Sequence, residues 1–242
     1  MEKFFRLIAK IIHELANVFL LTPILYIPGS IGNRLRALYY RPRLKYMGRN
    51  VLLDVGVQIQ NPKYISIGDN TWIDKYVILL AGMPWPGRVT YYKQNRDYPG
   101  QEGELRIGKN CHIAPYSLIS GHGGVWLGDN LTVASGCRVY SFSHHYRNLA
   151  DRDDPRRDYV FTSRAPEADQ AMISGPVVMQ DNTALGLNSV ILPGVTIGAG
   201  SWVGSMSLVT KDVEAGLVVV GNPAVITKKK AEIAQPSKSS EV

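Results

Sequence analysis

Histidine is the side chain in this sequence best suited to exchange a proton at neutral pH, because imidazole titrates close to physiological pH. Four of the five histidines lie in the middle of the chain, at His112, His122, His144 and His145. His144 and His145 are adjacent, and His122 stands in a glycine-rich stretch, residues 121–124. Imidazoles placed in this way could act as general bases, as hydrogen-bonding partners of a polar substrate, or as metal ligands.

The composition is that of an ordinary globular protein. The chain has 242 residues, of which 45% are apolar and 19% are charged. This length suits one good-sized domain, or one domain with a small appendage. The two cysteines, Cys111 and Cys137, give no disulfide framework, so we expect them to be small buried apolar residues in a reducing cytoplasm.

A six-residue repeat organises the chain from Leu53 to about Asp212. An aliphatic residue recurs at every sixth position, and five segments align: Ile65–Asn70, Leu105–Asn110, Val125–Asn130, Val177–Asn182 and Val195–Gly200. A period of six fits neither an α-helix nor a simple alternating strand. It indicates triangular coils of three short strands joined by tight corners, with one side chain per hexad pointing to the axis. The sequence therefore predicts a mainly β fold, a parallel β-helix of about six coils.

Two insertions interrupt the coils, near residues 83–103 and 145–175. We expect the β-helix domain over residues 51–214, an N-terminal segment over 1–50, and a C-terminal extension and tail over 215–242. The first insertion carries aromatic and basic side chains, among them Trp85, which suit a sugar ring and an anionic group. Packing of the loop, or contact with another subunit, would explain these side chains equally well. The second insertion has mixed charge and is expected to be a solvated loop.

The repeat and the closing stretch, Val209–Val213 with Val220–Ala224, resemble the hexapeptide-repeat acyltransferases, which form left-handed β-helices. Within that family the chain is similar to the galactoside and maltose O-acetyltransferases. The resemblance covers roughly two-thirds of the chain, residues 53–212. It implies a homotrimer that transfers an acetyl group from acetyl-CoA, its co-substrate, directly to a hydroxyl of a sugar or polysaccharide precursor, with no metal required.

The resemblance also assigns roles to the histidines. His144 stands five residues after the last inward residue of its coil, which is the place of the catalytic histidine in the sugar O-acetyltransferases, so it is the expected general base. His145 is its rival, and His122, His145 and Trp85 are candidate contacts of the acceptor. His122 replaces an acceptor-binding aspartate, and it either bonds a sugar hydroxyl or fills a glycine-rich turn. Ala114 replaces a site asparagine, which argues against a simple galactoside acceptor.

The acyl donor is expected along the C-terminal coils. Family members contact the pantetheine arm through backbone near the corners and hold the nucleotide end with a Thr-Lys pair, because lysine suits a phosphate. The matching positions in this chain are Gly186, Leu187, Gly204, Ser205, Thr210 and Lys211, with Lys228 beyond them. A tryptophan that is often found at the position of Ala184 is missing.

The net charge of +7 belongs to the N-terminal segment. Residues 1–50 contain nine basic and two acidic side chains, and the rest of the chain has eighteen of each. Apolar residues recur at helical spacing near the start, at Phe4, Phe5, Ile8, Ile11, Ile12 and Leu15. These features predict an amphipathic helix that lies peripherally on the inner face of the cell membrane. The alternative is a helix packed on its own body or on another subunit, and a nucleic-acid partner is not expected.

Three other functions compete with hydroxyl acetylation. An N-acetyltransferase for an amino sugar nucleotide or a xenobiotic would keep the donor and change the acceptor. A γ-carbonic-anhydrase-like hydratase needs three zinc histidines, two of them closely spaced across a coil. The order His112, His122, His144, His145 does not reproduce that pattern. A non-catalytic scaffold is disfavoured by His144 and by the Thr-Lys ending.

Overall fold

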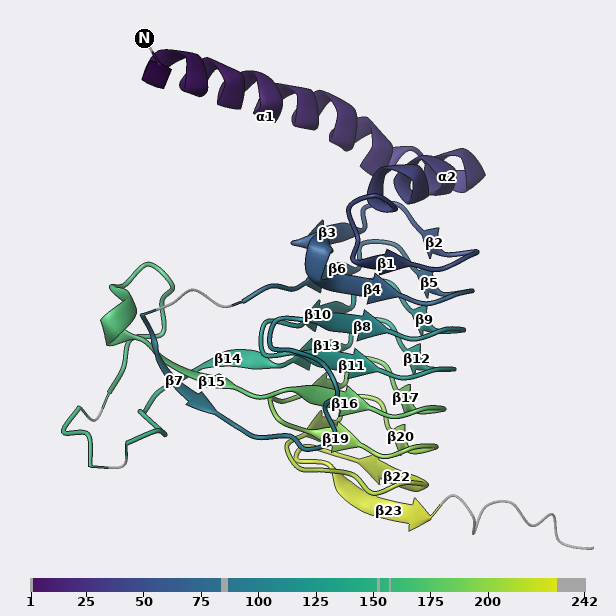
Figure 1. The fold of residues 1–242 in the computed structure, drawn as a ribbon. Coiled ribbons are helices and arrows are strands. Elements are labelled where there is room, and N and C mark those ends of the chain that lie inside the picture. Colours follow the sequence, from purple (N-terminus) through teal and green to yellow (C-terminus); the bar gives the residue numbers. More distant parts are fainter. Residues whose placement is uncertain (1, 84–86, 152, 157, 230–242) are drawn as a thin grey trace, which may run out of the picture.

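The computed structural model describes residues 2–83, 87–151, 153–156 and 158–229. Two helices come first and a prism of short parallel strands follows, with a side arm formed by the two insertions (Figure 1). The strands form three sheets, each named here by its first strand. Successive strands along the chain pass from the β1 sheet to the β2 sheet and then to the β3 sheet, which makes one triangular coil.

Each sheet takes one strand from every coil, in parallel. The β1 sheet contains β1 (Tyr46–Met47), β4 (Ile65–Ile67), β8 (Leu105–Ile107), β11 (Val125–Leu127), β16 (Val177–Met179) and β19 (Thr196–Ile197). The β2 sheet contains β2 (Leu52–Leu53), β5 (Trp72–Ile73), β9 (His112–Ile113), β12 (Thr132–Val133), β17 (Ala184–Leu185), β20 (Trp202–Val203), β22 (Leu217–Val220) and, antiparallel at its edge, β23 (Val225–Lys229). The β3 sheet contains β3 (Gln58–Gln60), β6 (Ile78–Leu80), β10 (Leu118–Ser120), β13 (Arg138–Tyr140), β18 (Val190–Ile191) and β21 (Leu208–Val209). Six complete coils result, which confirms the fold expected from the repeat.

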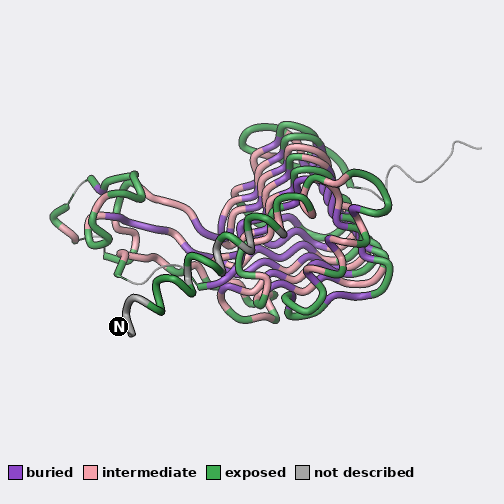
Figure 2. Tube along the Cα trace, turned by 90° about the horizontal axis from the view of Figure 1, so that it is seen from above, coloured by how far each residue is buried: buried purple, intermediate pink, exposed green. Residues whose placement is uncertain are grey.

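The predicted inward residues form the core. In the β1 sheet, Ile67, Ile107, Leu127, Met179 and Ile197 stand in register on successive strands, and all five are buried. The view along the axis shows buried positions lining the inside of the prism (Figure 2). Burial of one aliphatic side chain per hexad, at about 25 cal/mol per Å² of apolar surface, is the main stabilising contribution.

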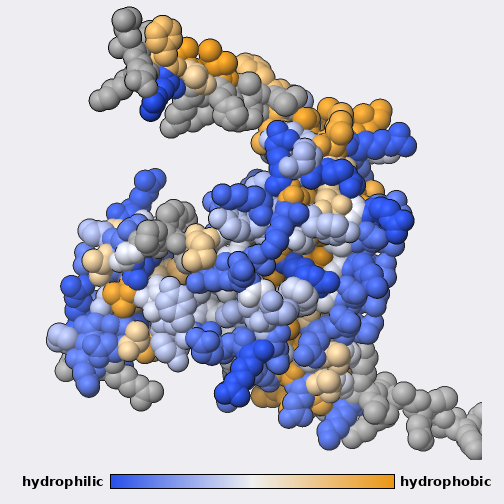
Figure 3. Space-filling model, in the orientation of Figure 1, coloured by the Kyte–Doolittle hydropathy of each residue, from blue (hydrophilic) through white to orange (hydrophobic). Residues whose placement is uncertain are grey.

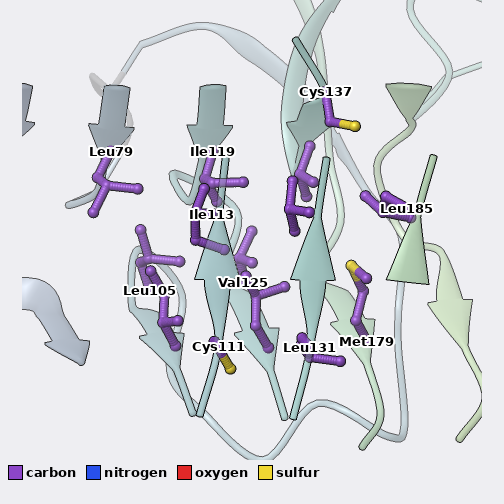
Figure 4. Packing of buried hydrophobic residues seen from close by; sticks show 14 of the residues in the cluster. Leu79, Leu105, Cys111, Ile113, Ile119, Val125, Leu131, Cys137, Met179 and Leu185 are labelled. Atoms are coloured by element: carbon purple, nitrogen blue, oxygen red, sulfur yellow. The ribbon is translucent and has the colours of Figure 1, made fainter. Parts of the chain in front are cut away.

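Both cysteines belong to this core. Cys111 and Cys137 are free thiols, and they point inward among aliphatic neighbours (Figure 4). Burial raises the pKa of both thiols, so they stay protonated. Their expected role as small buried apolar residues is confirmed.

The asparagine that ends several repeats turns the chain at one corner. Asn50, Asn70, Asn110 and Asn130 all have φ values between 55° and 57°, in the left-handed region that asparagine tolerates better than most residues. Their side-chain amides also bond to one another from coil to coil, with N···O distances of 3.0 to 3.3 Å. The asparagines therefore both permit the corner and connect neighbouring coils.

Helix α1 (Glu2–Tyr26) extends away from the prism, and α2 (Gly29–Tyr40) covers its first coil (Figure 1). Arg36 on α2 is fully buried and joins the two parts. Its Nη1 donates to the carbonyls of Ile24 and Ile27 at the end of α1, and its Nε donates to Leu53 O in the first coil. No helix among the described residues is long and apolar enough to cross a membrane.

The side arm is a small sheet of three strands. It consists of β7 (Val89–Tyr92) from the first insertion and β14 (Phe142–His145) and β15 (Ala171–Ser174) from the second. Strand β15 lies between the others, antiparallel to β14 and parallel to β7. Two single-turn 3-10 helices, η1 (Pro62–Tyr64) and η2 (Glu167–Asp169), lie in connecting segments.

Candidate active site

Both insertions leave the prism at the same corner. The first follows β6 and the second follows β13, and both strands end at the same edge of the β3 sheet. Leu80, Ser120 and Tyr140, the last residues of three neighbouring strands, stand in register there. Since β14 continues from this edge, His144 is held on a paired strand close to the prism.

A pocket of about 350 Å³ lies where the side arm meets the β3 sheet. His144 and His122 both line it, so the structure brings together two of the histidines that the sequence singled out. The remaining lining combines apolar side chains with hydroxyls and one guanidinium: Leu80, Arg88, Ser120, Tyr140, Phe142, Ser143, Ser163 and Met172.

His122 has a defined tautomer in this pocket. Its Nδ1 lies 3.0 Å from Gly82 O, and because a carbonyl only accepts, Nδ1 carries the proton. In the neutral ring Nε2 is then the acceptor. His122 also meets the edge of the Phe142 ring, with centroids 6.3 Å apart. This arrangement suits a residue that receives a hydrogen bond from a polar substrate.

His144 is half-buried, and its Nε2 lies 3.4 Å from Gln170 Oε1. The neighbouring His145 is directed differently, because successive residues of a strand point to opposite faces. The Nδ1 of His145 lies 2.9 Å from Arg147 O and 3.1 Å from Arg147 N, and its ring stacks on Tyr146 with centroids 4.7 Å apart. His145 does not line the pocket that contains His144. Trp85, the third candidate acceptor contact, lies outside the described residues.

The predicted donor-binding glycines stand at the corner between the β2 and β3 sheets. A Cβ atom on Gly186 would lie 2.5 Å from Ser205 N, and one on Gly204 would lie 2.4 Å from a Val220 methyl. Close stacking of coils therefore requires glycine at both positions, whatever else they do. Leu187 and Ser205, the residues that follow, are exposed and available to a ligand.

Thr210 and Lys211 follow β21, at the same edge of the β3 sheet as the pocket. Val139, Ile191 and Val209 stand in register on β13, β18 and β21, which places Thr210 two strands from Tyr140. Two strand spacings correspond to about 10 Å. Lys211 is exposed, and so is Lys228, which lies on β23 at the edge of the β2 sheet. The Thr-Lys pair thus shares an edge with His144, and Lys228 does not.

Two residues that touch His144 or its partner were not predicted as partners of this histidine. Arg88 belongs to the first insertion and Gln170 to the second, which was expected to be a solvated loop, yet Gln170 is fully buried. Neither residue belongs to the hexad pattern. The pairing of β7 with β15 brings Arg88 and Gln170 together, and the sequence contains no periodic pattern that predicts this pairing.

A second pocket, of about 320 Å³, lies beside the first insertion and includes Tyr98, Glu102, Gly123 and Ser174. Burial raises the pKa of the Glu102 carboxyl, although Ser174 Oγ donates to it at 3.4 Å. Burial and the nearby Glu104 and Glu102 raise the pKa of Tyr98. The Glu102 carboxyl therefore keeps its proton to higher pH than an exposed glutamate does.

Comparison with known proteins indicates which reaction such a site supports. No protein-family model matches the sequence. Over 180 residues, which are 74% of this chain and 79% of the relative, the sequence is 29% identical to the dTDP-4-amino-4,6-dideoxy-D-glucose acyltransferase of Escherichia coli. The structure is similar to that of AntD, an N-acyltransferase from Bacillus cereus, in complex with dTDP-4-amino-4,6-dideoxyglucose and coenzyme A. The TM-score is 0.62 and the identity 26%, over 81% of this chain and 89% of that chain.

The chain carries the hexapeptide repeat and is an acyltransferase. It uses an acyl-CoA as donor. A maltose O-acetyltransferase from Clostridium difficile, with a TM-score of 0.51 and 19% identity over 86% of this chain and 82% of that chain, shares the fold. Among the described residues of the acyltransferase, no three His, Cys, Asp or Glu side chains are grouped so that they could hold a metal ion.

Proposed function

We propose that this acyltransferase transfers an acyl group from acyl-CoA to the amino group of a nucleotide-linked amino sugar. The observation that carries the proposal is the relationship, over about three-quarters of the chain, to the Escherichia coli enzyme whose name states a dTDP-4-amino sugar acceptor. The likeness to AntD, which was solved with such a sugar, points to the same acceptor. Of the two acceptors considered from the sequence, the relatives favour the amine over the hydroxyl.

His144 is the general base of this reaction. The amine nitrogen attacks the thioester carbonyl, and as the N–C bond forms, His144 removes a proton from the nitrogen. The C–S bond then breaks, and the thiolate of coenzyme A leaves and takes up the proton. The products are an amide and free coenzyme A, with no covalent enzyme intermediate. A positioned base typically contributes about 10²–10⁴-fold to the rate of such a step.

The donor lies along the β3 sheet between its two flanking corners. Leu187 and Ser205 border one corner, and the pantetheine arm passes their backbone. Thr210 and Lys211 stand at the other corner, where a lysine suits the phosphates of the nucleotide. His122, which lines the same pocket, binds a polar group of the sugar. Lys228, on another sheet, contacts only a distal part of the donor.

The test is a screen for release of free thiol from acyl-CoA. Acetyl-CoA and 3-hydroxybutyryl-CoA, the latter bound by AntD, are each offered with dTDP-4-amino-4,6-dideoxyglucose, simple sugars and lipid-linked oligosaccharides. Thiol release that depends on the amino sugar nucleotide is the expected result. Release only with hydroxyl acceptors would restore the O-acetyltransferase hypothesis, and no release with any acceptor would contradict both.

A further inference from the structure

Arg88, Gln170 and His144 form a chain of contacts that joins both insertions to the pocket. Gln170 is fully buried directly after η2, and it stands next to β15. Its Oε1 accepts a hydrogen bond from Arg88 Nε at 2.8 Å and lies 3.4 Å from His144 Nε2. Its Nε2 donates to Ala165 O at 2.7 Å. These contacts determine where each proton of the group stands.

The orientation of the Gln170 amide follows from the chemistry of its neighbours. An arginine side chain has donors only, so the amide atom that faces Arg88 must be the oxygen. A backbone carbonyl only accepts, so the amide atom that faces Ala165 must be the nitrogen. Both contacts require the same orientation, and the oxygen is therefore the atom presented to His144.

The tautomer of His144 follows in turn. An amide oxygen cannot donate, so a hydrogen bond between it and Nε2 requires that Nε2 carry the proton. In a neutral imidazole only one nitrogen is protonated, which leaves the lone pair on Nδ1. We infer that Gln170 is a positioning residue that holds His144 in the Nε2–H tautomer, and that Nδ1 is the nitrogen that takes the proton from the acceptor.

Arg88 acts on His144 indirectly, through Gln170. Its Nε fixes the amide oxygen of Gln170, so the first insertion controls the base through the second. This inference rests on the proposed role of His144 as general base. Both insertions lie outside the hexad pattern, and the interaction therefore adds a function to segments that the repeat alone does not explain.

Two variants of Gln170 separate positioning from packing. Gln170→Glu keeps an acceptor next to Nε2 and adds a negative charge, which favours the imidazolium form of His144. Protonation of the ring would then occur at a pH about one unit higher, and the acidic limb of the kcat/KM profile would move by the same amount. Gln170→Met keeps the length of the side chain and removes the acceptor, so the preference for the Nε2–H tautomer would be lost.

The experiment uses the full-length protein labelled with ¹⁵N-histidine. Long-range ¹H–¹⁵N correlation spectra identify which ring nitrogen of His144 is protonated, and the His144→Ala spectrum assigns its signals. The expected result is the Nε2–H tautomer in the wild type, its loss in Gln170→Met, and a higher midpoint of protonation in Gln170→Glu. Gln58→Glu, an exposed change on β3 with the same charge, should leave the midpoint unchanged.

An Nδ1–H tautomer in the wild type, or a midpoint that stays the same in Gln170→Glu, would overturn the inference. The spectra need no acceptor, so they give their answer even if the proposed reaction is wrong. Conversely, a correct tautomer together with a fully active His144→Ala enzyme would reject the general base and keep the positioning contact.

Discussion

His144 and His145 show how a strand separates two identical side chains. On β14 they point to opposite faces, and only His144 lines the pocket at the edge of the β3 sheet. His145 is directed to Arg147 and Tyr146 in the second insertion. Sequence alone left these neighbours as rivals, and the pairing of β14 with β15 distinguishes them.

We predict that His144→Ala lowers the rate of acyl transfer by about 10²–10⁴-fold, the usual cost of losing a general base. Steady-state kinetics with the acceptor found in the screen measure the effect, and equilibrium binding of acyl-CoA should remain nearly normal. His145→Ala is the matched control and should retain most of the activity. The reverse pattern, an inactive His145→Ala and an active His144→Ala, would move the base to His145.

Lys211 offers a test of the donor site. Lys211→Ala should raise KM for acyl-CoA by up to about fivefold without changing kcat, because an exposed ion pair contributes at most ~1 kcal/mol. Lys63→Ala removes an exposed lysine in the first coil and should leave KM unchanged. Equal effects of the two substitutions, or none from either, would place the nucleotide elsewhere.

At the level of the elements, the six-residue repeat predicted the strands of the prism and their inward residues, but not the strands of the side arm. Inward residues such as Ile107 and Met179 occupy their expected places, because burial at every sixth position requires them to be aliphatic. The side arm was not predicted because its paired strands β7 and β15 are about eighty residues apart along the chain. Long-range pairing between single strands leaves no period in the sequence, so Arg88 and Gln170 could not be placed.

Helix α1 carries large apolar side chains that are mostly exposed in the described part of the chain. Phe5, Ile12 and Phe19 are 65%, 60% and 76% exposed, and Figure 3 shows hydrophobic side chains among the described residues of the helix. Exposed basic residues follow in the same N-terminal segment, including Arg34 and Arg49. Apolar insertion combined with attraction to anionic lipid gives the two signals that stable peripheral anchoring requires.

We predict that the full-length protein co-sediments with anionic vesicles and that a chain lacking residues 1–20 does not; this truncation keeps the carbonyls of Ile24 and Ile27 that accept from the buried Arg36. High salt should weaken the binding only partly, because salt screens the charges and leaves the apolar contribution in place. The truncated chain should still acylate a water-soluble acceptor. If the full-length protein ignores anionic vesicles and truncation instead reduces assembly, α1 is a packing element between subunits.

At the scale of the whole molecule, the pocket and several aromatic side chains of a single prism are exposed to solvent. Trp72 and Trp202 on the β2 sheet are 37% and 48% exposed, and Tyr116 at the adjoining corner is 63% exposed. Large apolar side chains on one face of a rigid prism are typical of contacts between subunits. Cyclic symmetry would close such a contact into a ring.

We predict a homotrimer, with a mass three times the 26.8 kDa of one chain. Size-exclusion chromatography with multi-angle light scattering measures this mass directly, and the same fractions should be assayed for activity. A monomeric mass in an active preparation would refute the trimer and would require a site completed within one chain.

The linkage of the product tests the central claim most directly. The enzyme is incubated with acyl-CoA and either dTDP-4-amino-4,6-dideoxyglucose or the same sugar nucleotide with a hydroxyl in place of the amine. The products are then analysed by mass spectrometry before and after mild alkali. We predict one added acyl group on the amino sugar that survives alkali, as an amide does, and no product from the hydroxyl counterpart. An alkali-labile ester on either sugar would contradict transfer to the amine.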